Sequence, residues 1–165
     1  MHYRRLIPAA LAIATLGFAA SAGAAGVAHQ SARAAAAAPT AAPTVSVRST
    51  KYGKILVDSS GNTLYLWAKD KTKNKTVCSD ACENVWPLAL VKGKPTVGPG
   101  VSASLLGTIP VTDSKVEREL TYNGHPLYRY VSDVKPGVIS GQGNTTFGAP
   151  WWLVSPTGAA ITKKA

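Results

Sequence analysis

The stretch LTYNGHPLYRYVSD, residues 120–133, decides the fold predicted for this chain. At its centre the pair Asn123-Gly124 separates two segments rich in aromatic and aliphatic residues. Asn-Gly in this setting is the strongest short signal for a β-hairpin with a two-residue loop, because both loop residues need positive φ. Such a loop pairs Tyr122 with His125 and thereby sets the register of the hairpin.

That register assigns the side chains of residues 116–122 and 125–131 to two faces. It also places Pro126 opposite Thr121 at a site where proline loses no ladder hydrogen bond. The aliphatic face, which we expect to be core, consists of Val116, Leu120, Leu127 and Val131. The other face, expected to be a surface or a second packing layer, consists of Glu117, Glu119, Tyr128 and Tyr130. Two carboxylates on one strand face are ordinary, so we do not interpret them as a glycosidase pair.

A second stretch, VDSSGNTLYLWAKD at residues 57–70, matches residues 120–133 without gaps. Gly, Leu-Tyr, an aromatic residue and Asp recur at one constant offset, which indicates an internal duplication. Further along, a Trp-Pro pair in the first copy matches a Trp-Trp pair in the second more roughly. We predict two repeats, about residues 52–92 and 115–156, that need each other to close one core.

The remaining pattern predicts one small, mainly β domain over residues 45–160. Further strands are expected at residues 45–49, 54–58, 63–67, 151–154 and 159–162. Residues 54–58 and 63–67 should form the hairpin of the first repeat. Short helical turns are expected at residues 79–84 and 101–106, and the glycine-rich residues 137–150 read as a loop.

The N-terminal part is typical of an exported protein. Residues 1–25 have the basic start, apolar run and small-residue end of a secretory signal peptide, with cleavage expected between Ala22 and Gly26. Whether the general or the twin-arginine route exports the chain is left open. Residues 26–44 are mainly Ala, Pro, Ser and Thr, and they lack the apolar area that would offset ordering, which predicts a disordered tether.

The chain has two cysteines, Cys78 and Cys82. In an exported chain such a close pair is expected to be oxidised, and its disulfide would fix a local turn. A redox-active disulfide is the alternative, although the spacing differs from C-x-x-C.

The chain has 18 basic and 8 acidic residues and a net charge of +10, which favours negatively charged partners. Such a charge either attracts an exported protein to an anionic cell-wall polymer or a membrane surface, or only keeps the protein soluble. One segment alternates lysines with other residues, and it is either a solvated loop or a docking stripe: Lys69, Lys71, Lys73 and Lys75. No nucleic-acid-binding module is recognisable, so nucleic acid is not an expected partner.

Both repeats contain the motif Y-x-[FWY]-x-x-D. Its residues are Tyr65, Trp67 and Asp70 in the first repeat, and Tyr128, Tyr130 and Asp133 in the second. Together with the segment that runs from Cys78 to a Trp-Pro pair, these motifs resemble the bacterial family called secreted repeat of unknown function, described as predicted lipoproteins. The resemblance implies export and repetition but no activity. A cysteine for lipid attachment is missing near the signal, so lipid anchoring is not carried over.

The six motif residues have two interpretations. In the first, the aromatic rings pack between the repeats, and each Asp is bonded to nearby backbone N–H groups. In the second, they form a ligand-binding cleft of rings and carboxylates suited to a sugar, a peptide or a cation. We expect the first, with the four aromatic side chains largely buried.

Signatures of catalysis and of cofactor binding are missing from the sequence. His125 is the one histidine beyond the tether and is expected to be a turn residue, so we expect neither a metal nor another cofactor. The sequence therefore indicates a non-catalytic module, either extracellular or associated with the cell envelope. Two alternatives stay open: an envelope redox or metal-associated protein, and a small hydrolase.

Overall fold

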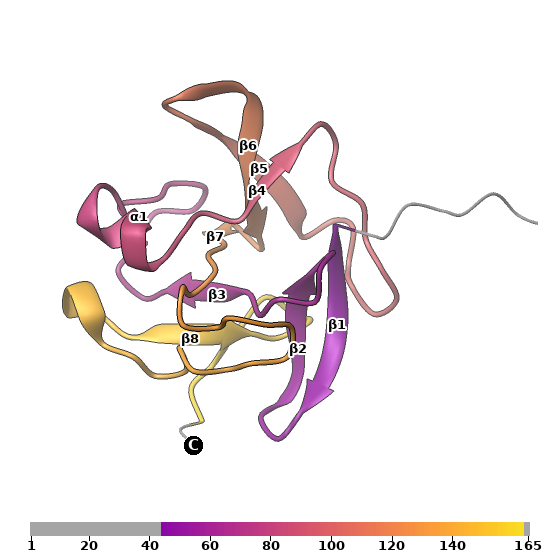
Figure 1. The fold of residues 1–165 in the computed structure, drawn as a ribbon. Helices are drawn as coiled ribbons and strands as arrows, with labels where there is room; N and C mark the ends of the chain where they lie inside the picture. Colours follow the sequence, from indigo (N-terminus) through magenta and orange to yellow (C-terminus); the bar gives the residue numbers. More distant parts are fainter. Residues whose placement is uncertain (1–43, 164–165) are drawn as a thin grey trace, which may run out of the picture. The chain divides into compact units, whose positions relative to one another are not determined.

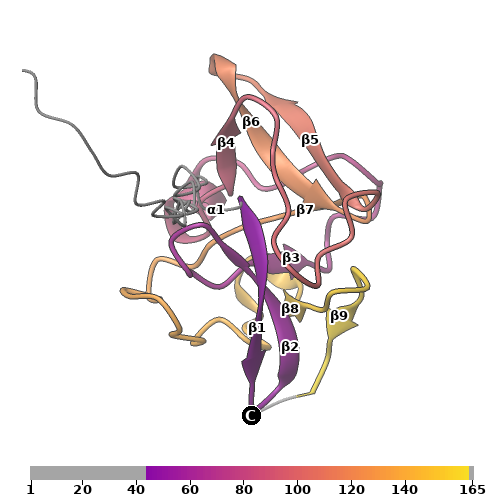
Figure 2. The same cartoon turned by 90° about the vertical axis from the view of Figure 1, so that its right-hand side faces the viewer.

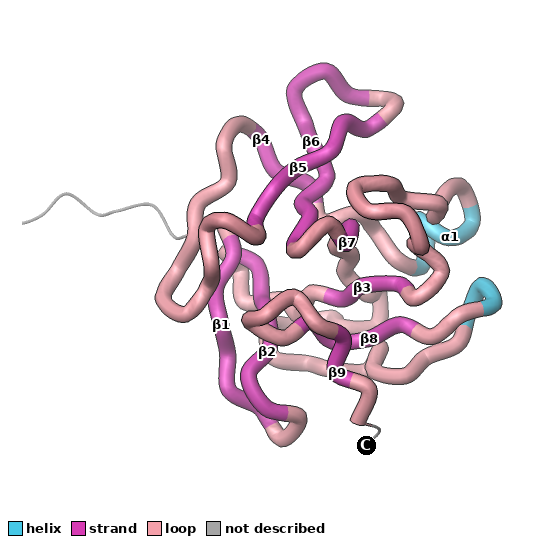
Figure 3. The backbone as a smooth tube through the Cα atoms, turned by 180° about the vertical axis from the view of Figure 1, so that it is seen from behind, coloured by secondary structure: helices cyan, strands magenta, loops and turns pink. Residues whose placement is uncertain are grey.

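The computed structural model describes residues 44–163. The predicted signal peptide, and the predicted tether up to residue 43, lie outside this range. The strands are β1 (Val45–Thr50), β2 (Gly53–Asp58), β3 (Tyr65–Trp67), β4 (Leu90–Lys92), β5 (Leu106–Val111), β6 (Ser114–Tyr122), β7 (His125–Pro126), β8 (Trp151–Val154) and β9 (Ala160–Ile161). Helical structure is limited to α1 (Ala81–Val85) and a 3₁₀ turn at Thr146–Gly148 (Figure 3). The prediction of a mainly β fold is confirmed.

The strands form three small antiparallel sheets (Figure 1). β1 and β2 form a hairpin, β3, β8 and β9 form the second sheet, and the third has the order β4-β6-β5, with β7 also paired to β6. In the turned view the β5–β6 hairpin extends away from β1 and β2 (Figure 2). No helix among residues 44–163 is long and apolar enough to cross a membrane.

The hairpin predicted around Asn123-Gly124 is confirmed. Asn123 and Gly124 have φ of 51° and 81°, as a two-residue loop of this type requires. Tyr122 pairs with His125, and Thr121 pairs with Pro126. Strand β7 is short because the chain after it turns to pair with other segments.

The hairpin predicted for the first repeat forms only at its turn. Asp58 N–H donates to the carbonyl of Asn62 at 2.9 Å, and Val57 bridges to Thr63. Beyond that point β3 pairs with β8, while β2 pairs with β1. The reason lies in burial: residues 63–67 are all buried, so they form a central strand and not one half of a two-stranded ribbon.

The two turns differ by one residue, which corrects the ungapped alignment. Leu64 N–H donates to the carbonyl of Leu56, as Leu127 N–H donates to that of Leu120. Because the first loop is one residue longer, Leu56 and not Val57 is the structural counterpart of Leu120. The residue before each leucine then also corresponds, so a buried isoleucine, Ile55, stands in the first repeat where the second has Glu119.

The predicted core face of the second hairpin is wrong at two positions, because Val116 and Val131 are 68% and 49% exposed. On the other face Glu119 and Tyr128 are fully buried, as a second packing layer requires. The cause is that β6 begins at the tip of the projecting β5–β6 hairpin (Figure 2), where its residues are exposed or half-buried, and is buried only over its last four residues. From Glu119 onward both faces of the strand are covered, and its alternation ends.

The core has two clusters, and strands β2, β3 and β8 contribute side chains to both of them. One is aliphatic and includes Leu56, Leu64, Leu120 and Leu127. The other holds most of the buried aromatic rings and both cysteines, which form the predicted disulfide. Of the two predicted helical turns, the one at residues 79–84 forms as α1, whereas residues 101–105 are an irregular segment that leads into β5.

Candidate functional site

The repeated motifs meet at Tyr65 and Tyr128, the equivalent tyrosines of the two repeats. Each N–H donates to the carbonyl oxygen of the other, both at 2.9 Å. Around this pair the strands exchange partners: Tyr65 pairs with Leu153 of the second repeat, and Tyr128 bridges to Leu88 of the first. Equivalent residues that bond reciprocally define a pseudo-twofold axis, so the repeats are interlocked at their motifs.

The side chains of the motifs cross in the same way. Tyr65 Oη donates to Asp133 Oδ2 at 2.7 Å, and Tyr128 Oη donates to Asp70 Oδ2 at 2.6 Å. Each tyrosine therefore binds the aspartate of the other repeat. Burial, followed by the neighbouring carboxylates, raises the pKa of both phenols far above the usual value. Both phenols stay protonated and act as permanent donors to these carboxylates.

The second oxygen of each aspartate orders a loop. Asp70 Oδ1 accepts the N–H of Val77 at 2.8 Å, and Asp133 Oδ1 accepts the N–H of Ser140 at 2.9 Å. The two bonds span the same number of residues, which repeats the symmetry. The expectation that both aspartates bind nearby backbone is confirmed.

The large rings form a symmetric stack across the axis. Trp151 and Trp86 lie at its centre, with ring centroids 3.9 Å apart, and the outer rings are Trp67 on Trp151 at 4.8 Å and Tyr130 on Trp86 at 4.2 Å. Trp67 is 2% exposed, and both central tryptophans are fully buried. The burial expected for the motif is confirmed, except that Tyr130 at the end of the stack is only partly buried.

Both motif tyrosines also contact this stack. Tyr65 packs edge-on against Trp86 at 5.4 Å, and Tyr128 packs edge-on against Trp151 at 5.0 Å. Both tyrosines are fully buried. Their rings and hydroxyls are therefore occupied by contacts within the chain, and ligand binding by the six motif residues stays a prediction.

Glu119 is a buried residue on the hairpin face that the sequence interpretation left open as a surface or a second packing layer. It is fully buried, and neither carboxylate oxygen has a hydrogen-bond partner among the described residues. Burial, followed by the charges of Asp70 and Glu83, raises its pKa to about 8. The loss of alternation from Glu119 to Tyr122 is invisible in the sequence, because the segment still reads as an ordinary alternating strand.

The lysines of residues 69–75 lie on an irregular loop after β3, and all four side chains are exposed. Lys69 Nζ is 5.1 Å from the ring centroid of Trp67 and donates to the carbonyl of Phe147 at 3.4 Å, which fixes one end of the loop against the core. Asn74 N–H donates to the carbonyl of Gly124 at 2.7 Å and fixes the other end. The loop is therefore held against both repeats.

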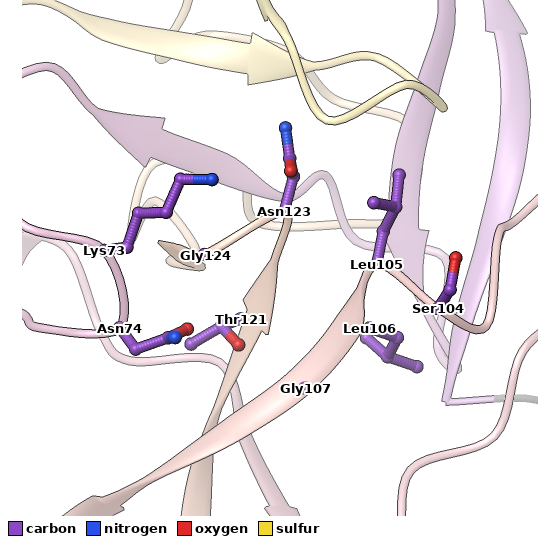
Figure 4. Close-up of a pocket in the computed structure, with 9 residues that line it drawn as sticks. All are labelled: Lys73, Asn74, Ser104, Leu105, Leu106, Gly107, Thr121, Asn123 and Gly124. Atoms are coloured by element: carbon purple, nitrogen blue, oxygen red, sulfur yellow. The ribbon is translucent and has the colours of Figure 1, made fainter.

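A cavity of about 320 Å³ opens beside this loop (Figure 4). Lys73 and Asn74 stand on one side of it, and Leu105 and Ser104 stand on the other. Asn123 stands at the border of the cavity between the two sides. Within residues 44–163 the side chains of Lys73, Asn74 and Asn123 make no hydrogen bond, so the cavity presents one cation and two free amides.

The described residues form no cluster of metal-ligating side chains. No three His, Cys, Asp or Glu side chains in the described part of the chain lie close enough together to hold a metal ion. His125 stands at the β6–β7 turn, as expected. Burial and the charge of Lys73 lower its pKa.

Comparison with known families finds two repeats in the chain. A family described as a secreted repeat of unknown function matches residues 46–90 and 111–155. The chain belongs to this family. The two matched segments contain both copies of the motif, and the family is described as secreted. No curated protein and no solved structure matches the chain.

Proposed function

We propose that this secreted repeat protein is a non-catalytic module of the cell envelope that binds an anionic polymer through the lysine loop, residues 69–75. The supporting observation is the cavity beside that loop, which Lys73, Asn74 and Asn123 all line. An ammonium with neighbouring amides suits phosphate or carboxylate groups that repeat along a polyol chain. The excess of basic over acidic residues, which remains after removal of the predicted signal peptide, adds long-range attraction to such a polymer.

The crossed motifs have a supporting part in this proposal. Asp70 lies directly before the exposed part of the loop. Its hydrogen bond with Tyr128 fixes the start of that part, and its hydrogen bond with the N–H of Val77 fixes the end. A loop held at both ends loses less conformational entropy when it binds, so more of the interaction energy remains for affinity. The motif residues thus position the surface without touching the polymer.

The experiment measures binding of the secreted protein to an immobilised poly(glycerol phosphate), with neutral dextran as the reference. The variant K71Q/K73Q/K75Q removes three loop charges and leaves Lys69 on Trp67. We expect binding to the phosphate polymer alone, weakened by salt, and about tenfold or more weaker in the variant, as expected for the loss of several charge-assisted contacts.

The matched control is K54Q/K94Q/K135Q, which removes the same charge at three exposed lysines outside the loop. It should retain most of the binding. Equal losses in both variants would assign the attraction to net charge and contradict a site at the loop. Stronger binding to anionic lipid vesicles than to the polymer would assign the partner to a membrane surface instead.

A further inference from the structure

The acidic residues of this basic protein are distributed unevenly. Four of the eight acidic residues are either buried or bonded to the core: Asp58, Asp70, Glu119 and Asp133. The other four all line one cavity of about 560 Å³: Asp80, Glu83, Asp113 and Glu117. The cavity lies between α1 and the tip of the β5–β6 hairpin, which face each other in Figure 1. Both repeats and the segment between them contribute to it.

The carboxylates of this cavity repel one another. Burial, followed by the charges of Asp80 and Asp113, raises the pKa of Glu83. Lys92 lies 3.7 Å from Glu117 at the edge of the cavity, but the Lys92 side chain is 74% exposed and screens that carboxylate only weakly. The other three carboxylates have no ion pair within residues 44–163, so they form a site of concentrated negative potential.

Glu119 lies next to the wall of the same cavity. Side chains alternate along a strand, so Glu119 lies on the face of β6 that carries Glu117, a residue of the cavity wall. Its partner across the strand pair is Leu90, which also lines the cavity. A carboxyl group that is fully buried and unpartnered thus lies behind the cavity floor, where the first repeat has Ile55. Natural proteins rarely leave such a group unsatisfied without a functional reason.

The negative potential of the cavity suits a cation, and its volume and lining indicate which kind. A volume of about 560 Å³ is in the range of small-molecule sites and is much larger than a bare ion requires. The part of the wall nearest the sheet is aliphatic and consists of Leu88, Leu90, Pro110 and Val111. The described carboxylates are also too dispersed to hold one metal ion.

We propose that this cavity binds an organic amine, with its ammonium groups at the acidic rim and its hydrocarbon part on the aliphatic wall. A cation bound in the cavity, close to Glu119, stabilises the ionised form of that carboxyl group. Binding near neutral pH therefore releases a proton from Glu119. This site is separate from the lysine loop, and the two bind partners of opposite charge.

The test titrates the secreted protein with 1,6-diaminohexane by isothermal calorimetry at pH 7, in two buffers of different ionisation enthalpy. The uncharged analogue 1,6-hexanediol and Ca²⁺ are the comparison ligands. We expect the diamine to bind with proton release and the diol not to bind. The variant E83Q/D113N should bind about tenfold or more weaker, as expected when two charge-assisted contacts are lost, whereas E119Q should bind without proton release.

Each control excludes one rival explanation. The variant S59K/S60K raises the net charge as much as E83Q/D113N does, on an exposed turn away from the cavity, and should bind the diamine like the wild type. Thermal unfolding confirms that every variant is folded. No diamine binding, equal binding of the diol, or a preference for Ca²⁺ would overturn the proposal. Diamine binding without proton release from the wild type would remove Glu119 from the site.

Discussion

The buried carboxyl group of Glu119 predicts how the stability of this protein changes with pH. In the folded chain its pKa is raised to about 8 from an ordinary 4.5, because burial disfavours the charged form. Between these two values the folded state holds a proton that the unfolded state has released. The contribution of Glu119 to stability is therefore complete below the unfolded pKa and is lost as pH rises toward 8.

The size of the effect follows from the same shift. Because the folded state holds one more proton than the unfolded state, the free energy of unfolding falls by about 1.4 kcal/mol for each unit that pH rises between the two pKa values. Over the whole interval from 4.5 to about 8 the loss amounts to about 5 kcal/mol. Replacing Glu119 with isoleucine, the residue of the first repeat at this position, removes the titrating group and fills the site with apolar atoms. We expect Glu119→Ile to be several kcal/mol more stable than the wild type at pH 9.

The assay is urea unfolding of the wild type and Glu119→Ile at pH 5, 7 and 9. Titrating groups that do not interact with Glu119 are present in both proteins and cancel in the difference between them, which therefore reports Glu119 together with its coupling to Asp70 and Glu83. That difference should grow steadily with pH in favour of the variant. The matched control is Glu117→Gln, which alters a carboxyl group on the same strand face whose side chain is 35% exposed, and its difference from the wild type should not grow in this way. Parallel pH profiles for the wild type and Glu119→Ile would refute the reasoning.

Two further predictions concern the core. Trp67→Ala removes an outer ring of the aromatic stack, where the side chain is 2% exposed, and should cost about 3–5 kcal/mol in the free energy of unfolding; normal stability in thermal melts would mean that the stack is not a structural element. Replacing Cys78 and Cys82 together by alanine opens a short loop and should cost about 2 kcal/mol. Thiol labelling of the native wild type should detect no free cysteine, because the chain's two cysteines are bonded to each other, and rapid labelling without reductant would contradict this.

Local signals in the sequence were sufficient for the local features of the fold. The Asn123-Gly124 turn follows from the φ values that its loop demands, and the Cys78–Cys82 disulfide follows from export and spacing. The recurrence of aromatic residues in a chain with two Phe and one Met correctly indicated that those residues fill the core. These inferences need only neighbours along the chain and the composition.

Contacts between residues far apart in the chain could not be predicted from the sequence. Nothing in the spacing of Tyr65 and Asp70 says that each binds a residue of the other repeat, because the choice depends on how the repeats interlock. The same holds for Glu119, whose burial depends on the segments that cover both faces of β6. An alternating pattern identifies a strand, but it does not say whether the second face is covered.

The most direct test of the interlocked repeats is a double-mutant cycle across them. Tyr65→Phe and Asp133→Asn are made singly and together, and urea unfolding gives the coupling energy. A hydrogen bond to a partly buried carboxylate predicts a coupling of about 1.5–3 kcal/mol. The control cycle combines Tyr65→Phe with Asp70→Asn, the motif pair within one repeat, and should give a coupling below about 0.5 kcal/mol. Strong coupling within the repeat and none across it would contradict the interlocked arrangement of the two motifs.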